Sequence, residues 1–466
     1  MVASFDSTLQ ASDWNRFRGP NGSGVSADGA VPPKAWSDTE NLLWKAELPG
    51  PGSSCPIIIG DKVIVTCWTG YGTDRQNLGE MEQLKRNVIC LNRADGTVLW
   101  NHEEAAVLPE DEYRGMFAEH GYSSHTPVSD GENVYVFFGK TGVLALSLAD
   151  GKPLWKTPVG ENLEQRGWGS ASSPILVEDL VIVPAFVEGD SLVALKKSTG
   201  EVVWKQTAPG YDGNWSTPIL VKVDETRTDI VIAVPGEIWG VNPENGKLRW
   251  FCVVPGSDSA RASVIEHNGI IYAMSGRGGG CVAIKAGGKG DVSEKNVLWS
   301  NPSDNSGIGT PVLVNDRMYL FSGRTATVVD AKTGERIEQM RLRTTTTGAA
   351  PESGRSEQPA QSPQGGPGQQ GGPGGGFGGG FGGGGRGGRG GGAGGQDYAS
   401  PVVAGNLLFY PARNGDFFVF ELGEKLTQVS TNNFGEDRSD FSASPAVADG
   451  QLFVRSAKAV YCIVQK

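Results

Sequence analysis

The side chains best suited to chemistry recur at one position of a short sequence motif that marks the start of each repeat. Two copies of the motif read "STPIL" and "ASPVV", five more are related to these, and one has the form "RASVI". On the fold that the repeat predicts, the third residue before its proline (or before Val264) should line the mouth of a central channel. Around the ring these residues are Ser53, Ser124, Ala171, Trp215, Arg261, Ile308, Tyr398 and Ser442.

Trp215, Arg261 and Tyr398 are large among small neighbours, and Trp168 and His125 lie in the same loops. One cation, several aromatic rings and several hydroxyls could hold a flat anionic or sugar-like ligand. These five are therefore the candidate ligand-binding residues. The alternative is that they only plug a channel that is narrow for most of its length.

A metal site is not predicted. His120 and His125 have acidic neighbours, but the spacing "HGYSSH" is not helical and fixes no ligand geometry. Those neighbours are Asp111, Glu112 and Glu119.

No catalytic residue is predicted either. The glycines of "GRGGGC" (276–281) precede a strand rather than a helix, so we interpret them as a corner and not as a phosphate loop. No GxSxG or similar nucleophile motif occurs.

The six cysteines form no CxxC pair. Cys90 and Cys462 occupy repeat positions that elsewhere hold alanine, which favours buried core thiols. Cys55 and Cys67 flank a "GD" corner, and a disulfide between them is left open.

The repeat itself predicts the fold. Its eight copies mostly start 44 to 47 residues apart. Each contains short runs of β-branched and aromatic residues separated by turns, as in "NVYVFFGKTGVLALSLADGKPLW". Four strands at this period are typical of propeller blades.

The chain ends predict how the ring closes. The last unit stops after its third strand, and "NLLWKAEL" (41–48) is a fourth strand without its first three. Joined, they complete one blade and remove a free sheet edge. We therefore predict an all-β, eight-bladed β-propeller of four-stranded antiparallel blades, a single domain over 41–466, with residues 1–40 packing on it.

Six tryptophans share one place in the outer strands and are interpreted as structural residues that pack between neighbouring blades. They are Trp44, Trp100, Trp155, Trp204, Trp250 and Trp299.

The segments "ADGTVLW", "ADGKPLW" and "STGEVVW" resemble the PQQ-like β-propeller repeats of quinoprotein alcohol dehydrogenases and of BamB-type outer-membrane assembly scaffolds. The opening "DWNRFRGPNGSGVS" resembles that of secreted PQQ-like propellers of planctomycete-type bacteria. The resemblance implies a periplasmic or extracellular location.

Three insertions should share one face, because loops between strands two and three lie on the same side as the loops joining blades. They are 69–87, 102–122 and 343–397. The last is rich in glycine and should be disordered. The insertion-bearing face is therefore the expected binding side.

Composition narrows the class of partner. The net charge of -11 argues against nucleic-acid binding, even though "RGGRGG" resembles RNA-associated tracts. No apolar run is long enough for a transmembrane helix, and no signal peptide is evident. We expect a monomer.

Two functions follow from the resemblance. The first is a non-catalytic binding or scaffold propeller that holds a protein, peptide or glycan partner and needs no cofactor. The second is a PQQ-dependent alcohol or sugar dehydrogenase, which would need PQQ, a Ca²⁺ site and a catalytic Asp. The chain lacks the adjacent "CC" pair common in that class, so the first is preferred.

Overall fold

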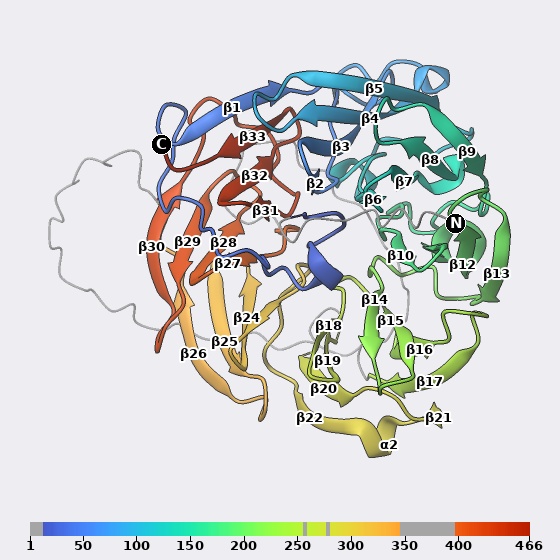
Figure 1. Ribbon diagram of the computed structural model, residues 1–466, viewed down its shortest axis with the longest axis vertical. Coiled ribbons are helices and arrows are strands. Elements are labelled where there is room, and N and C mark those ends of the chain that lie inside the picture. The colour runs from blue at the N-terminus through green and yellow to red at the C-terminus, as the bar shows by residue number, and fades with distance from the viewer. Residues whose placement is uncertain (1–12, 255–258, 276–279, 345–396) are drawn as a thin grey trace, which may run out of the picture. The chain divides into compact units, whose positions relative to one another are not determined.

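The chain folds into eight antiparallel sheets around a central channel, as the computed structural model shows (Figure 1). The structure describes residues 13–254, 259–275, 280–344 and 397–466. The predicted eight-bladed β-propeller is confirmed. The expected disordered segment 343–397 lies almost wholly outside the described residues. Of the corner at 276–281, only Gly280 and Cys281 are described, and Cys281 begins a strand.

Each blade has four main strands, which follow one another outward from the channel in chain order except in blade 8, whose outermost strand is β1. Blade 1 consists of β2 (Ile57–Ile59), β3 (Lys62–Thr69), β4 (Lys85–Asn92) and β5 (Val98–Ala105). Blade 2 consists of β6 (Val128–Ser129), β7 (Asn133–Phe137), β8 (Val143–Ser147) and β9 (Pro153–Thr157). Blade 3 consists of β10 (Ile175–Val177), β11 (Leu180–Ala185), β12 (Ser191–Lys196) and β13 (Val202–Thr207). Blade 4 consists of β14 (Ile219–Lys222), β15 (Thr228–Val234), β16 (Glu237–Val241) and β17 (Leu248–Val253).

The other half of the ring repeats this order. Blade 5 consists of β18 (Ile265–His267), β19 (Ile270–Met274), β20 (Cys281–Lys285) and β22 (Val297–Asn301). Blade 6 consists of β23 (Val312–Val314), β24 (Arg317–Ser322), β25 (Thr325–Asp330) and β26 (Arg336–Arg341). Blade 7 consists of β27 (Val402–Ala404), β28 (Leu407–Pro411), β29 (Phe417–Glu421) and β30 (Thr427–Asn432). Blade 8 consists of β31 (Ala446–Ala448), β32 (Gln451–Arg455), β33 (Ala459–Ile463) and β1 (Leu42–Glu47).

Burial explains the composition of these strands. In blade 2, β7 and β8 are buried on both faces and are nearly continuous in apolar residues. The outermost strand β9 is largely exposed, and only Trp155 and Thr157 are partly buried. Inner strands are covered by the blades on either side, so they need apolar side chains on both faces.

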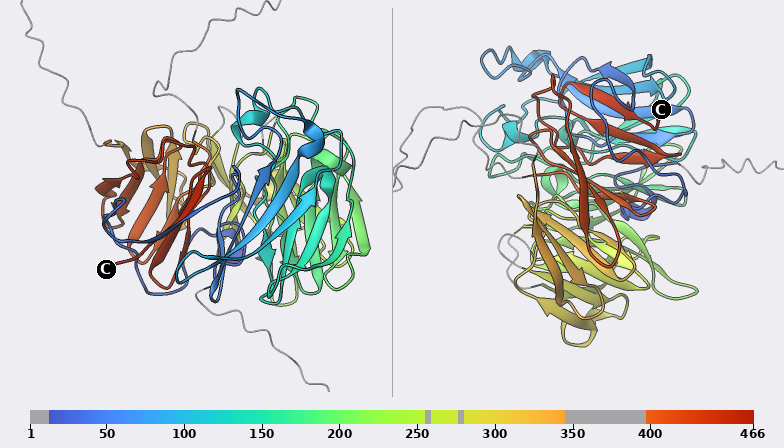
Figure 2. Two further views of the ribbon diagram at one scale, coloured as in Figure 1. Left: turned by 90° about the horizontal axis from the view of Figure 1, so that it is seen from above. Right: turned by 90° about the vertical axis from the view of Figure 1, so that its left-hand side faces the viewer.

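The two ends of the chain close the ring within blade 8. Strand β1 pairs antiparallel with β33, and Trp44 lies opposite Cys462. In Figures 1 and 2 the blue β1 lies beside the red strands of this blade. The ring is closed within one four-stranded sheet, because both termini contribute strands to it, and β1 covers the edge of β33.

Five outer-strand tryptophans contact the next blade in the same way. Each indole N–H donates to a carbonyl three residues before a turn glycine of that blade, as Trp44 does to Arg93 at 2.8 Å. A Cβ added to Gly96 would come within 2.6 Å of the Trp44 ring, so the turn glycine lies flat on the indole. The other four donor–acceptor pairs are Trp100–Leu148, Trp155–Lys197, Trp204–Pro243 and Trp299–Ala331.

Trp250 differs from the other five. Its indole N–H donates to the Asp229 carboxylate of its own blade at 2.8 Å. In blade 5 the usual turn is replaced by a longer segment, which contains β21 (Gly290–Asp291) and α2 (Ser293–Asn296). Strand β21 adds to blade 4 by pairing parallel to β17.

Residues 13–25 cross the channel and contact blades 1, 4 and 7, with Asn21 bonded to Leu220 of blade 4. Trp14 forms a β-bridge with Ile58 of blade 1, and Val25 forms one with Val403 of blade 7. The short helix η1 (Pro20–Gly22) lies at the centre of the ring in Figure 1. This segment closes the channel below its mouth.

The described helices are short. They are η1, η2 (Met81–Gln83), η3 (Phe117–Glu119), η4 (Gly139–Thr141), α1 (Phe186–Gly189) and α2. Among the described residues, none of the helices has the length and apolar character needed to cross a membrane.

Candidate functional site

A pocket of about 320 Å³ opens at the channel mouth. All eight residues expected at the mouth line it, including Trp215, Arg261 and Tyr398, and Trp168 does too. Met116 and His120 join them from the insertion 102–122. Phe17, from the N-terminal segment, also lines the pocket, so the crossing segment contributes to its floor.

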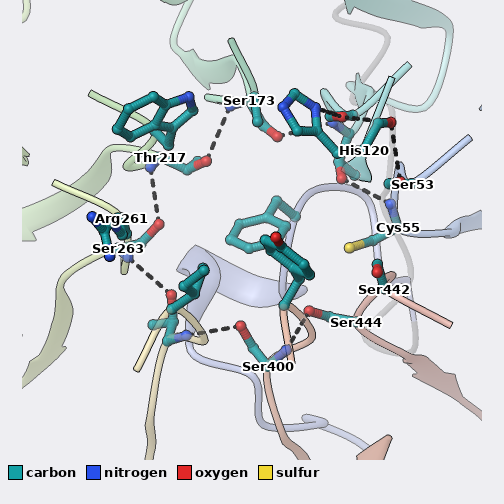
Figure 3. A pocket seen from close by; sticks show the side chains of 18 of the residues that line it. Ser53, Cys55, His120, Ser173, Thr217, Arg261, Ser263, Ser400, Ser442 and Ser444 are labelled. Atoms are coloured by element: carbon teal, nitrogen blue, oxygen red, sulfur yellow. Dashed lines mark hydrogen bonds between the residues drawn. The ribbon is translucent and has the colours of Figure 1, made fainter. Parts of the chain in front are cut away.

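A ring of side chains, which we call the hydroxyl ring, surrounds the pocket. Each blade contributes to it the residue directly before its start proline, or before Val264 in blade 5. In seven of the eight blades, the N–H at this position donates to the side-chain oxygen of the same position in the next blade, over 2.8–3.0 Å. Figure 3 shows several of these bonds as dashed lines. The ring consists of Cys55, Thr126, Ser173, Thr217, Ser263, Thr310, Ser400 and Ser444.

Cys55 supplies a thiol where the other seven blades supply a hydroxyl. Ser444 interacts with this thiol and so closes the circle. Burial raises the pKa of Cys55, although the Thr126 and Ser444 hydroxyls favour the thiolate. Cys55 and Cys67, for which a disulfide was left open, are both free thiols.

Trp168 and Trp215 form the aromatic wall of the pocket. Their ring centroids lie 5.6 Å apart at an interplanar angle of 31°. The Trp215 indole N–H donates to the Gly169 carbonyl at 2.8 Å. The guanidinium carbon of Arg261 lies 5.9 Å from the Trp168 ring, which is cation–π range.

The loop that carries Trp168 is held from two sides. The Glu164 carboxylate accepts the N–H groups of Arg166 and Trp168 at 2.8 and 2.9 Å. The His120 Nε2 lies 2.5 Å from the Trp168 carbonyl and must donate to it, because a carbonyl can only accept. Burial lowers the pKa of His120, which favours this neutral tautomer.

Tyr398 forms the opposite wall, with a charged group behind it. The Arg413 guanidinium carbon lies 5.3 Å from the Tyr398 ring. Arg413 pairs with both Glu119 and Asp440. These two carboxylates are therefore occupied by an arginine and do not line the pocket.

His125 lies behind the pocket wall and does not line it. Successive side chains alternate in an extended segment, so Ser124 and Thr126 face the pocket and His125 points away. The His125 ring packs on Phe137 with centroids 4.6 Å apart. Its Nε2 is 3.0 Å from the Ser170 hydroxyl, which in turn donates to Glu188.

A buried charged cluster surrounds this histidine. Arg86 pairs with Glu110, and Lys140 donates to a backbone carbonyl of the same loop. Burial raises the pKa of Glu188 to about 7 and lowers that of His125 to about 3. The adjacent cavity measures about 30 Å³, enough for a water molecule and too small for an organic ligand.

The sequence predicted the eight mouth residues that line the pocket. It did not predict the hydroxyl ring or the contribution of Phe17 to the pocket floor. The hydroxyls have a sequence signal, since Ser or Thr precedes most of the start prolines. Phe17 has none, because it comes from outside the repeats. Among the described residues, no carboxylate lines the pocket, and no three His, Cys, Asp or Glu side chains are grouped to hold a metal.

Two curated relatives align with part of this chain. A tetrathionate hydrolase from Acidithiobacillus ferrooxidans is 21% identical over 341 residues, covering 65% of this chain and 61% of its own length. The outer membrane protein assembly factor BamB of Xanthomonas campestris pv. campestris is 29% identical over 168 residues, covering 36% and 34%. The chain thus spans less than two thirds of each relative.

Two solved structures share the fold. BamB from Moraxella catarrhalis matches with a TM-score of 0.56 and 12% identity, covering 91% of this chain and 97% of that one. Quinohemoprotein alcohol dehydrogenase from Comamonas testosteroni matches with a TM-score of 0.61 and 11% identity, covering 99% and 81%. At these identities the likeness concerns the fold alone.

A family model described as outer membrane protein assembly factor BamB matches residues 84–337. The match covers more than half of the chain. The chain therefore belongs to this family of PQQ-like β-propellers.

Proposed function

We propose that this BamB-family propeller is a non-catalytic binding protein of the cell envelope that holds the end of a glycan in the channel-mouth pocket. The observation that carries the proposal is the composition of the pocket wall. Two tryptophans and a tyrosine offer flat apolar faces, while a ring of hydroxyls lies around the same space. A pyranose has this same combination of an apolar ring face and peripheral hydroxyls.

The hydroxyl ring favours a glycan over a peptide. A peptide that adds as a strand needs free backbone N–H and C=O groups on its receptor. Seven backbone N–H groups at the pocket are already bonded to the side chain of the next blade. What remains for a ligand is mainly side-chain hydroxyls and aromatic faces.

The dehydrogenase alternative needs groups that this pocket does not supply. Ca²⁺ takes six to eight oxygen ligands, and carboxylates are prominent among them. No carboxylate lines the described pocket, whose only ionised side chain is Arg261. The pocket residues therefore do not fit a Ca²⁺–PQQ pair, and we derive no redox step here.

The test is capture on a glycan array by the wild-type chain and by a Trp168→Ala/Trp215→Ala variant. The proposal predicts that the wild type is retained on a subset of glycans and that the double variant loses at least tenfold in signal. Leu154→Ala serves as control, because Leu154 is exposed on the outer strand β9. Equal capture by the double variant and the wild type would place the glycan elsewhere, and no capture at all would reject a glycan ligand.

A further inference from the structure

We propose that pH regulates the channel-mouth pocket through a buried relay of Glu188, Ser170 and His125, which holds the end of the loop that carries Trp168. Protonated Glu188 keeps this loop, residues 164–170, in place, and loss of the proton loosens it. The effect on glycan binding rests on the proposed function, whereas the loosening of the loop can be measured without a ligand.

Glu188 has few partners for a buried carboxyl group. It lies on α1 and is only 3% exposed, and its Oε1 accepts the hydroxyl of Ser170. Its Oε2 is buried and has no hydrogen-bond partner among the described residues. An ionised carboxylate has about four acceptor sites, so a single donor leaves most of its charge unsolvated. Burial accordingly raises the pKa of Glu188 to about 7.

The hydrogen bonds of the relay depend on the proton of Glu188. When Glu188 is ionised, the single hydrogen of Ser170 must point to it. The Nε2 of His125, 3.0 Å from the Ser170 hydroxyl, must then donate to Ser170. A protonated Glu188 has an O–H of its own and can also donate to Ser170, which permits the opposite direction. The protonated form thus has more ways to satisfy the same three groups.

The relay is joined to the aromatic wall through the backbone. Ser170 directly follows Gly169, whose carbonyl accepts the indole N–H of Trp215 at 2.8 Å. Gly169 in turn follows Trp168. The Glu164 carboxylate holds the beginning of the loop, and Ser170 holds its end. A shift of Ser170 is therefore passed within two residues to both tryptophans of the wall.

Hydration of an ionised Glu188 requires the loop to move. The cavity of about 30 Å³ is lined by Glu188, Ser170 and Gly169, and it can hold about one water molecule. A loop that opens exposes Glu188, which then regains an ordinary pKa of about 4.3 and releases its proton. Opening therefore becomes more favourable as the pH rises from about 4.3 through 7.

Other charged groups face the same cavity. Arg86 pairs with Glu110, and Lys140 donates to a backbone carbonyl. Burial raises the pKa of two further carboxyls, Glu164 and Asp111, that of Asp111 to about 6. The titratable and charged side chains that line the cavity beside Glu188 are Arg86, Glu110, Asp111, Tyr122, His125 and Lys140. A variant of Glu188 is therefore needed to separate its titration from that of Asp111 and Glu164.

Hydrogen exchange followed by mass spectrometry tests the coupling in the ligand-free chain. Wild type is compared at pH 5 and pH 8 with Glu188→Gln, which cannot ionise, so the intrinsic effect of pH on exchange cancels in their ratio. We expect the protection of residues 164–170, relative to that variant, to fall about tenfold or more between the two pH values. Glu161→Gln is the matched control and should behave as wild type, because Glu161 is an exposed glutamate in the same linker.

The equivalent linker into blade 6, residues 303–308, is the internal reference. Its relative protection should not change, because its local opening leaves Glu188 buried. An equal fall in both linkers would mean that Glu188 acts only on global stability and would overturn the coupling. A constant ratio in residues 164–170, or loss of the pH effect in Glu161→Gln, would overturn it as well. Melting temperatures show whether each variant keeps the fold.

A second readout is the ring of His125. The chain has four histidines, so ¹⁵N labelling of histidine alone gives few signals. Burial lowers the pKa of His125 to about 3, so its ring stays neutral between pH 5 and pH 8. Its nitrogen shifts should nevertheless move in wild type and in Glu161→Gln, and stay constant in Glu188→Gln. Constant shifts in wild type would show that Glu188 does not titrate in this range.

Calorimetry with an oligosaccharide selected by the glycan array measures the consequence for binding. Wild-type affinity should fall about threefold or more from pH 5 to pH 8, because only the closed fraction binds, and Glu188→Gln should vary less. Constant affinity with a loosened loop would overturn the regulation. A loop that loosens in a chain that captures no glycan would reject only the proposed function, and glycan capture without loosening would reject only the relay.

Discussion

The Trp215 indole N–H donates to the carbonyl oxygen of Gly169 over 2.8 Å. Gly169 directly follows Trp168, whose ring lies 5.6 Å from that of Trp215. The two tryptophans belong to the linkers that enter blades 3 and 4, so this bond ties two loops into one wall. The wall is thus preorganised, which lowers the entropy lost when a ligand binds.

Replacing Trp215 should reveal both of its roles. Trp215→Phe keeps a ring but removes the bond to Gly169, and we expect about a fivefold loss of glycan affinity, as one hydrogen bond contributes about 1 kcal/mol. Trp215→Ala removes the ring as well and should lose more than tenfold. Calorimetry with a captured oligosaccharide measures both. Unchanged affinity in Trp215→Ala would show that this ring only plugs the channel.

Trp44 should contribute to ring closure. Trp44→Ala removes a ring that is only 7% exposed and bonds to Arg93 of blade 1, so we expect a loss of about 3–5 kcal/mol in the free energy of unfolding. Leu43→Ala, on the same strand but 37% exposed, should cost much less. Denaturant unfolding followed by circular dichroism measures both.

A double-mutant cycle tests whether this effect acts through the facing glycine. Gly96 has φ +74° and a Cβ there would meet the Trp44 ring, so Gly96→Ala should destabilise the wild type. In the Trp44→Ala background the steric part of that cost should disappear. Additive effects would mean that the contact between the two residues contributes little.

Glu188 should make stability depend on pH. Burial raises its pKa to about 7 in the folded chain, against about 4.3 when unfolded. Between these values the folded state holds a proton that the unfolded state releases. The stability from this group is therefore full below about pH 4 and is lost as the pH rises through 7, by at most about 4 kcal/mol.

Glu188→Gln removes this titration. The wild type should lose stability relative to the variant between pH 5 and pH 8, when both are measured by urea unfolding across that range. Parallel curves for the two proteins would show that Glu188 is ionised throughout. His125, whose pKa burial lowers to about 3, stays neutral in the folded state but is protonated on unfolding below about pH 6.5. It therefore lowers the stability of both proteins equally at the acidic end of this range and cancels from their difference.

Addition of PQQ and Ca²⁺ should not produce an enzyme. The pocket wall lacks the carboxylates that would hold Ca²⁺, so we expect no dye reduction with a panel of alcohols and sugars. The assay follows tryptophan fluorescence in parallel, because Trp168 and Trp215 line the pocket and would report PQQ that binds there without turnover. Saturable dye reduction at micromolar PQQ would establish the dehydrogenase alternative.

The fold was predictable because its signals are local and repeated. The alternation of apolar residues, the turn glycines and the tryptophan of each unit all recur, and the incomplete first and last units fixed how β1 joins β33. The eight mouth residues followed from the same alignment, since equivalent positions of a repeat come together around the ring.

The rest of the site depends on contacts that the repeat does not encode. Phe17 and Arg18 come from the N-terminal segment, and only the three-dimensional path of residues 13–25 brings them under the pocket. His125 was placed at the mouth because it lies next to Ser124. Alternation of side chains along the extended strand entry points it the other way, to Ser170.

The most direct test of the account is a crystal structure of the chain with an oligosaccharide that the glycan array selects. The account predicts that the terminal sugar ring packs against Trp168 and Trp215, with its polar edge toward the hydroxyl ring around Thr217 and Ser263. Density for the sugar on the outer strands or on the opposite face, with the pocket filled only by water, would contradict it.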